Sequence, residues 1–345
     1  MPKVPKEVTK EQYMLKSTFF LEKLDSFGFF KLYEDIKKIA FDHAKAHSWN
    51  ERKDWCIDEQ AWEAIKRTKI NPLLVFAHPN ILKIYPAMLK YYRSVAMLPQ
   101  KGLSAISGFS GIRAVENEKK GIPEKKLGQV LCALNEVMST LIKLVSALDE
   151  EKIKGMMFAT AGTTIDGSWR NQIGSEGERV IRSLILRKLL DNKEVTAFVL
   201  KNGSSKSTEE WDNEDPVKHI NEIKSFTNIN GTVVIFGSEP DIEFRNSEGK
   251  VLGGVEIKAG LDPAGALERL GAMFKSFENM LQQYPAAATI LIASCITDEV
   301  GQRLRTSRSV QQTYITTDVM SNEKGQADKF CNSIRGILEL VEKRM

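Results

Sequence analysis

The sequence places two carboxylates and one ammonium group at a spacing that could hold a divalent metal ion beside a phosphate. Asp241 follows Pro240, and Glu256-Ile257-Lys258 begins fifteen residues after Asp241. Mg²⁺ in proteins takes one or two carboxylates and fills its other positions with water and phosphate oxygens. We therefore predict Asp241, Glu256 and the carbonyl of Ile257 as metal ligands, with Lys258 orienting the attacking water. The chemistry indicated is hydrolysis of a phosphodiester bond.

A β-hairpin would bring these groups together. Residues 241–245 alternate polar and apolar side chains, residues 246–249 form a turn sequence, and residues 251–258 return as an apolar strand. Successive strand residues point to opposite faces, so Glu256 and Lys258 share one face while the apolar residues between and before them share the other. In the alternative interpretation, the acids are ordinary exposed strand residues and Lys258 pairs with one of them across the surface.

Pro240-Asp241 with Glu256-Ile257-Lys258 resembles the PD-(D/E)XK motif of the restriction-endonuclease-like nucleases. The continuation through residues 258–271 is similar to type II restriction endonucleases of the XcyI kind. The resemblance implies an α/β fold with a mixed sheet flanked by helices, and Mg²⁺-dependent hydrolysis of double-stranded DNA that leaves 5′-phosphate and 3′-hydroxyl ends. It also implies a homodimer, with one active site for each strand of a palindromic sequence.

The resemblance further implies an accessory acid on a helix that precedes the first core strand. We expect this helix over residues 175–189, with Ser175 as its N-cap. Glu178 is the favoured catalytic acid and Glu176 is its competitor. In the alternative interpretation, both acids interact only with the positive helix N-terminus, and Glu178 pairs with Arg182 four residues on.

Two regions with different patterns predict two domains. Residues 1–155 have helical periodicity and predict an α-helical domain that supports DNA binding or dimerisation, whereas residues 156–345 predict the catalytic α/β domain. Residues 202–211 are polar and are expected to form a loop. The expected strands are 195–200, 232–236, 242–244, 251–258 and 289–296, and the expected helices are 263–283, 298–306 and 324–343.

Residues that could contact DNA are harder to identify. Arg170 and Gln172, in the segment expected just before residue 175, are of the types that pair with guanine and adenine edges. Arg269 in the helix after Lys258 is a weaker candidate. Arg303, Arg305 and Arg308 could neutralise phosphates, and so could the pairs Lys119-Lys120 and Lys125-Lys126. In the alternative interpretation, these basic groups are solvated surface.

The composition of the chain limits which partners and compartments we expect. The net charge of +4 over 345 residues does not itself indicate a nucleic-acid partner. No unbroken apolar stretch reaches membrane-spanning length, so we expect no membrane association. Four scattered cysteines predict neither a zinc site nor a disulfide framework; a cytoplasmic protein is expected, with Cys132 and Cys295 as buried small hydrophobes.

Two other functions remain open. A structure-selective repair nuclease or resolvase would share Asp241, Glu256 and Lys258, although the large helical region argues against a minimal resolvase. A nonenzymatic DNA-binding protein would keep the fold without the chemistry, and the intact set of two acids and a lysine argues against it. A requirement for Mg²⁺ in cleavage would separate the enzymes from the binding protein.

Overall fold

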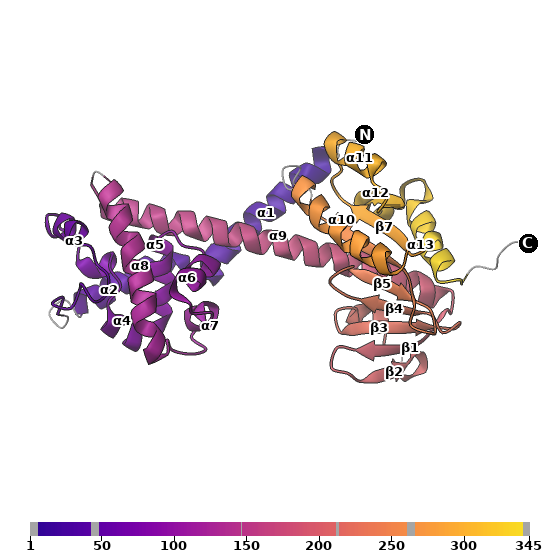
Figure 1. Ribbon diagram of the computed structural model, residues 1–345, viewed down its shortest axis with the longest axis horizontal. Helices are drawn as coiled ribbons and strands as arrows, with labels where there is room; N and C mark the ends of the chain where they lie inside the picture. Colours follow the sequence, from indigo (N-terminus) through magenta and orange to yellow (C-terminus); the bar gives the residue numbers. More distant parts are fainter. Residues whose placement is uncertain (1–5, 43–47, 146, 212–213, 261–265, 341–345) are drawn as a thin grey trace, which may run out of the picture. The chain divides into compact units, whose positions relative to one another are not determined.

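The computed structural model describes residues 6–42, 48–145, 147–211, 214–260 and 266–340, without the side chains of residues 6–9, 266–269 and 323. The chain forms two compact units, which we call the helical unit (Thr9–Trp169) and the sheet unit (Met1–Val8 with Arg170–Met345) (Figure 1). The division at residues 169 and 170 differs from the expected boundary at 155 and 156. Both positions lie inside α9 (Glu150–Asp191), a single helix of 42 residues, so no loop marks the boundary.

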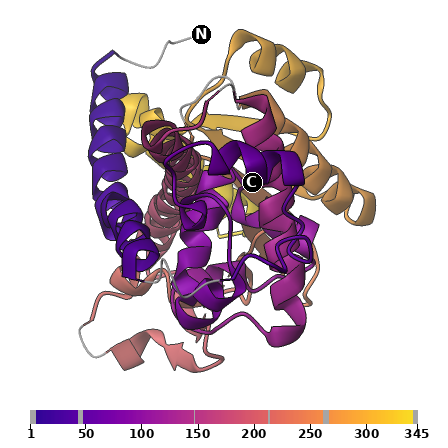
Figure 2. The ribbon, with the colours of Figure 1, turned by 90° about the vertical axis from the view of Figure 1, so that its left-hand side faces the viewer.

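The helical unit is built from short and long helices, as the periodicity predicts (Figure 2). These helices pack around one apolar core. Besides the first part of α9, it contains α1 (Lys6–Ser26) from Thr9 onward, α2 (Phe29–Asp42), α3 (Glu59–Lys66), η1 (Pro72–Leu74), α4 (Pro79–Ile84), η2 (Pro86–Met88), α5 (Leu89–Val95), α6 (Gln100–Ser107), α7 (Ile112–Glu116) and α8 (Glu124–Leu144).

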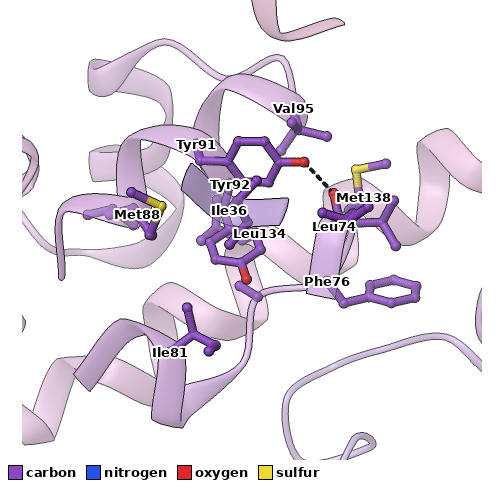
Figure 3. Close-up of a cluster of buried hydrophobic side chains, with 14 of the residues drawn as sticks. Ile36, Leu74, Phe76, Ile81, Met88, Tyr91, Tyr92, Val95, Leu134 and Met138 are labelled. Carbon is purple, nitrogen blue, oxygen red and sulfur yellow. Dashed lines mark hydrogen bonds between the residues drawn. The ribbon is translucent and has the colours of Figure 1, made fainter. Parts of the chain in front are cut away.

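Two buried polar side chains in this core have clear partners. Tyr91 donates its hydroxyl to the carbonyl oxygen of Leu74 at 2.7 Å, in the middle of the apolar cluster (Figure 3). Arg93 is only 1% exposed and binds the carboxylate of Glu116 through Nε at 2.5 Å. Because an unpaired buried charge is costly, this ion pair fixes how α5 and α7 lie against each other.

The cysteines depart from expectation. Cys56 and Cys132 form a disulfide between the loop before α3 and the middle of α8. Cys132 and Cys295 are half-buried, so the prediction that both are buried small hydrophobes is wrong. Seventy-six residues separate the bonded pair, and spacing in the sequence gives no sign that folding brings them together.

Helix α8 is long and apolar enough to cross a membrane by length and composition, but half of its apolar window is buried inside the protein. Its buried face includes Leu127, Val130, Leu134 and Met138, which belong to the core of the helical unit. A core helix of a globular unit accounts for this composition.

The sheet unit contains one eight-stranded mixed sheet, in the order β2-β1-β3-β4-β5-β6-β7-β8. Neighbours from β2 to β6 are antiparallel, whereas β6, β7 and β8 are parallel. The strands are β1 (Val195–Leu200), β2 (Ser205–Ser207), β3 (Ile223–Asn228), β4 (Val233–Phe236), β5 (Ile242–Arg245), β6 (Val251–Lys258), β7 (Ala288–Ala293) and β8 (Gln312–Ile315).

Helices cover both faces of this sheet, as the expected fold class requires (Figure 1). The second part of α9 packs with α13 (Gln326–Ile337) on one face, and α10 (Ala266–Gln283) packs with α11 (Asp298–Thr306) on the other. The remaining elements are η3 (Thr208–Trp211), η4 (Pro216–His219), α12 (Thr316–Met320) and η5 (Glu323–Gly325). Strands β2, β3 and β8 were not expected, and residues 202–211 contain β2 and η3 rather than a loop alone.

Candidate active site

The hairpin of β5 and β6 positions the predicted metal ligands. Asp241 immediately precedes β5, and its carbonyl oxygen accepts a hydrogen bond from the N–H of Gly237 at 3.1 Å across the turn from β4. Ile242 pairs with Val255 in the antiparallel register, which brings the start of β5 beside the end of β6. A Cβ on Gly254 would lie 2.7 Å from Cγ of Pro240, so glycine lets the turn approach β6 closely.

Three side chains meet at the carboxyl end of β6. The ammonium nitrogen of Lys258 lies 2.5 Å from Oε2 of Glu256 and 3.5 Å from Oδ2 of Asp241. The N–H of Ile257 donates to the same Asp241 oxygen at 2.7 Å. One cation therefore lies between two carboxylates, all within a single hairpin.

These acids are not ordinary surface residues. Asp241 is 7% exposed and Glu256 is 3% exposed, which excludes the interpretation that they are exposed strand residues. Burial, together with the charge of Asp241, raises the pKa of Glu256 above its ordinary value of 4.5. Burial tends to lower the pKa of Lys258, but Asp241 and Glu256 outweigh it and the pKa is raised. The ammonium remains charged at neutral pH and partly compensates the two carboxylates.

The pocket beside Lys258 is mostly apolar. It lies between the sheet and the helices α10 and α11, so low-polarity walls adjoin one side of the charged cluster. Its described lining consists of Lys258, Gly260, Leu270, Met273, Leu291, Ala293, Cys295 and Val300.

Helix α9 brings a third carboxylate to the hairpin. The helix is continuous through residues 174–178, so the prediction that a helix begins with Ser175 as its N-cap is wrong. It approaches the residue after Lys258 so closely that a Cβ on Gly177 would lie 2.1 Å from Cβ of Ala259. A glycine at this position therefore sets the distance between α9 and the end of β6.

Glu178 faces the charged cluster, whereas Glu176 does not. Burial and the charge of Asp241 raise the pKa of Glu178, and Arg182 and Lys258 partly oppose that rise. Glu176 is paired with Arg179 at 2.5 Å, and this hydrogen-bonded pair lowers its pKa. The geometry thus favours Glu178 over Glu176 as the accessory acid.

Arg182 is a site residue that the motif did not indicate. Its Nη2 lies 2.7 Å from Oε2 of Glu178, as the i,i+4 pairing predicts, and 3.2 Å from the carbonyl oxygens of both Gly237 and Asp241. Its guanidinium lies 5.2 Å from the ring centroid of Phe236. The Arg182 side chain therefore joins α9 to the turn that carries Asp241. In the sequence, the only sign of this role was the spacing of four residues between Glu178 and Arg182.

Four of the residues predicted to contact DNA, Arg170, Gln172, Arg303 and Arg305, form no described contact with this cluster. Arg170 and Gln172 are exposed on α9 itself, so their expected position just ahead of the helix that carries Glu178 is wrong. Arg303 and Arg305 are exposed on α11, where Arg303 lies 3.5 Å from Glu299. The side chain of Arg269, in α10, lies outside the described residues.

The donor set suits a hard divalent cation. In the described part of the chain, no group of three or more His, Cys, Asp or Glu side chains is placed to hold a metal ion. Mg²⁺ does not require such a group, because it usually binds one or two carboxylates and retains several waters. Asp241 and Glu256 provide two buried carboxylates, and burial together with the charge of Asp241 raises the pKa of Glu256. The carbonyl of Ile257 is the third predicted ligand.

Comparison with known proteins gives one family. Residues 50–341 match the XcyI restriction endonuclease family, and this match covers most of the chain. A search of curated proteins found no match to the chain.

Proposed function

Because the chain belongs to the XcyI restriction endonuclease family, we propose that it is a type II restriction endonuclease. It hydrolyses phosphodiester bonds of double-stranded DNA at a specific sequence and leaves 5′-phosphate and 3′-hydroxyl ends. The observation that supports this most strongly is the meeting of the buried carboxylates of Asp241 and Glu256 with the half-buried ammonium group of Lys258. Family membership supports DNA as the substrate.

Asp241 and Glu256, with the carbonyl of Ile257, would hold Mg²⁺. When bound, the metal stabilises negative charge on the phosphate and lowers the pKa of a coordinated water. The N–H of Ile257 fixes one oxygen of Asp241, so that carboxylate keeps its orientation as ligands enter and leave.

Lys258 would hold and orient the attacking water with its ammonium group. Its raised pKa keeps the group protonated at neutral pH, so it acts as a hydrogen-bond donor and a fixed positive charge. The positive charge would also stabilise the phosphate as negative charge develops on its oxygens.

Glu178 would act as the accessory acid, with Arg182 as the residue that positions it. Burial and Asp241 raise the pKa of Glu178, so a proton on this carboxyl is less costly than on an exposed glutamate. Arg182 holds this carboxylate and the carbonyl of Asp241 at once, and so keeps the acid in register with the hairpin.

The direct test incubates the purified chain with long duplex DNA, with Mg²⁺ or with chelator, and sequences the fragment ends. Discrete Mg²⁺-dependent fragments that share one terminal sequence are expected. Asp241→Asn and Lys258→Met should each abolish these fragments while the far-ultraviolet circular dichroism stays native. Glu243→Gln is the matched control, because Glu243 lies in the same hairpin but pairs with Arg245.

Other outcomes would favour other functions. If cleavage survives both Asp241→Asn and Lys258→Met, these residues do not form the catalytic centre. Random or branch-limited cutting would favour a repair nuclease or resolvase, and DNA retention without cutting would favour a nonenzymatic binding protein.

We also propose that the enzyme is a homodimer in the cytoplasm. A two-fold axis would give each strand of a palindromic site its own cutting centre. Analytical ultracentrifugation with and without DNA would measure the assembly, and a monomer in both conditions would contradict it.

A further inference from the structure

The helical unit carries six exposed or half-buried cationic side chains on the elements that flank the turn between α6 and α7: on α6, on α7, and on the segment that leads into the first turn of α8. The turn spans residues 108–111, and α6 packs against both α7 and α8 (Figure 1). Five of the six side chains are exposed and one is half-buried. We call this set the basic platform: Lys101, Arg113, Lys119, Lys120, Lys125 and Lys126.

Two of the lysines reach the turn directly. Nζ of Lys120 lies 5.7 Å from the ring centroid of Phe109, and its Cε lies 2.8 Å from where a Cβ on Gly111 would stand. Nζ of Lys126 lies 3.7 Å from the corresponding position on Gly108, which has a φ of +60°. Segments before and after the break at residues 121–123 thus direct their side chains to one place.

The positive charge of the platform is largely uncompensated. None of its six members forms an ion pair with another described residue. Of the nearby acids, Glu116 is buried against Arg93 and Glu124 pairs with Lys83. Glu118 is the remaining acid in residues 100–129, so one acid without an ion pair stands against the six cations of the platform.

Helix electrostatics make this placement unfavourable for the free protein. Lys125 and Lys126 lie in the first turn of α8, and Pro123 provides no side-chain cap. Cations near the positive end of a helix destabilise it, and like charges in proximity repel one another. A bound polyanion would offset both effects.

We propose that the basic platform binds the sugar-phosphate backbone of duplex DNA, so the helical unit contributes sequence-independent affinity. This inference rests on the proposed function, which makes DNA the substrate. Lysine ammonium groups act as point charges that suit phosphate contacts, and base reading in DNA more often uses bidentate arginine, asparagine or glutamine. Five of the six platform cations are lysines. The platform therefore holds DNA, and sequence reading belongs elsewhere.

The test measures DNA affinity against salt concentration, with chelator present so that the DNA remains intact. The quadruple variant replaces Lys119, Lys120, Lys125 and Lys126 with glutamine. Each lost phosphate contact should reduce the slope of log K against log salt by about 0.9, and should weaken binding roughly 8-fold at 0.1 M salt. A reduction of the slope by about 2 to 4 is expected, and it should be similar for DNA of any sequence.

The matched control is the double variant Lys31→Gln, Lys38→Gln, which removes two exposed charges from α2 in the same unit. It should leave the slope nearly unchanged. As a measurement independent of variants, lysine acetylation of the wild-type protein should be suppressed by DNA at Lys119 and Lys120, and much less at Lys31.

Several results would overturn the proposal. If the wild type cuts DNA but the quadruple variant keeps the slope of the control, the platform is refuted and the proposed function stands. Equal acetylation of Lys119 and Lys120 with and without DNA would also refute the platform and leave the proposed function standing. Wild-type protein that neither binds nor cuts DNA would refute both, and binding to phosphatidylserine vesicles in place of DNA would assign the platform to a membrane surface.

Discussion

Substituting Gly177 with alanine tests whether the approach of α9 to β6 sets the geometry of the site. The new Cβ would lie 2.1 Å from Cβ of Ala259, whereas non-bonded carbon atoms are most stable about 3.5–4.0 Å apart. The helix and the strand end must therefore separate by more than about 1 Å. That separation would move Glu178 and Arg182 away from Lys258.

The expected effects on stability and rate differ in size. Overpacking costs about 1–3 kcal/mol, and alanine recovers about 0.8–1 kcal/mol of helix propensity relative to glycine, so the net loss of unfolding free energy is small. A displacement of 1 Å at a catalytic centre can lower the rate about 100-fold. We expect Gly177→Ala to remain folded and to cut DNA about 100-fold more slowly.

Gly174→Ala is the matched control for this prediction. It lies one turn earlier on α9, and a Cβ there meets nothing within 4 Å. It should raise the melting temperature and leave the single-turnover cleavage rate unchanged. If Gly177→Ala cuts DNA as fast as Gly174→Ala, the contact between α9 and β6 does not set the site geometry.

Three further predictions use the same measurements. Glu178→Gln should lower the cleavage rate about 100-fold and Glu176→Gln should not; the reverse order would mean that the wrong acid has been assigned. Because the pKa of Glu256 is raised, its contribution to the unfolding free energy falls as pH rises from 4.5 through the raised pKa. The stability of Glu256→Gln relative to wild type, measured in urea without metal, should therefore increase with pH, and a flat difference would contradict the assigned burial. Reducing the bond between Cys56 and Cys132 should lower the unfolding free energy by about 4 kcal/mol, given the 76-residue separation; four reactive thiols in the unreduced denatured chain would show that no disulfide forms.

The part of the site that the sequence predicted is local in the chain. Alternation in β5 and β6 predicted that Glu256 and Lys258 share a face, and a short turn predicted that Asp241 would join them. The structure contains both features. Where all the residues of a feature lie within one hairpin, spacing and periodicity are sufficient to locate them.

The predictions that were wrong concern features that depend on contacts between segments distant in the sequence. Gly174-Ser175 resembles a helix start, but α9 continues through it because flanking residues of the same helix pack into both apolar cores. The hydrogen bond from Arg182 to the carbonyl oxygen of Asp241 joins residues 59 apart in the sequence. β3 and the edge strands β2 and β8 were missed because strand pairing depends on the neighbours that the fold supplies.

The hydrogen bonds of Arg182 imply an order of assembly for the site. The contact between Lys258 and Asp241 closes 17 residues, whereas Arg182 must close 59 residues to reach the same turn. Loop-closure entropy rises with length, so the hairpin with its two carboxylates has the smaller entropic barrier to formation. A chain with a formed hairpin and an undocked α9 would hold the proposed metal ligands Asp241 and Glu256 without Glu178. Docking of α9 would then be the folding event that completes the cutting centre, so a partly folded chain would lack the complete catalytic set.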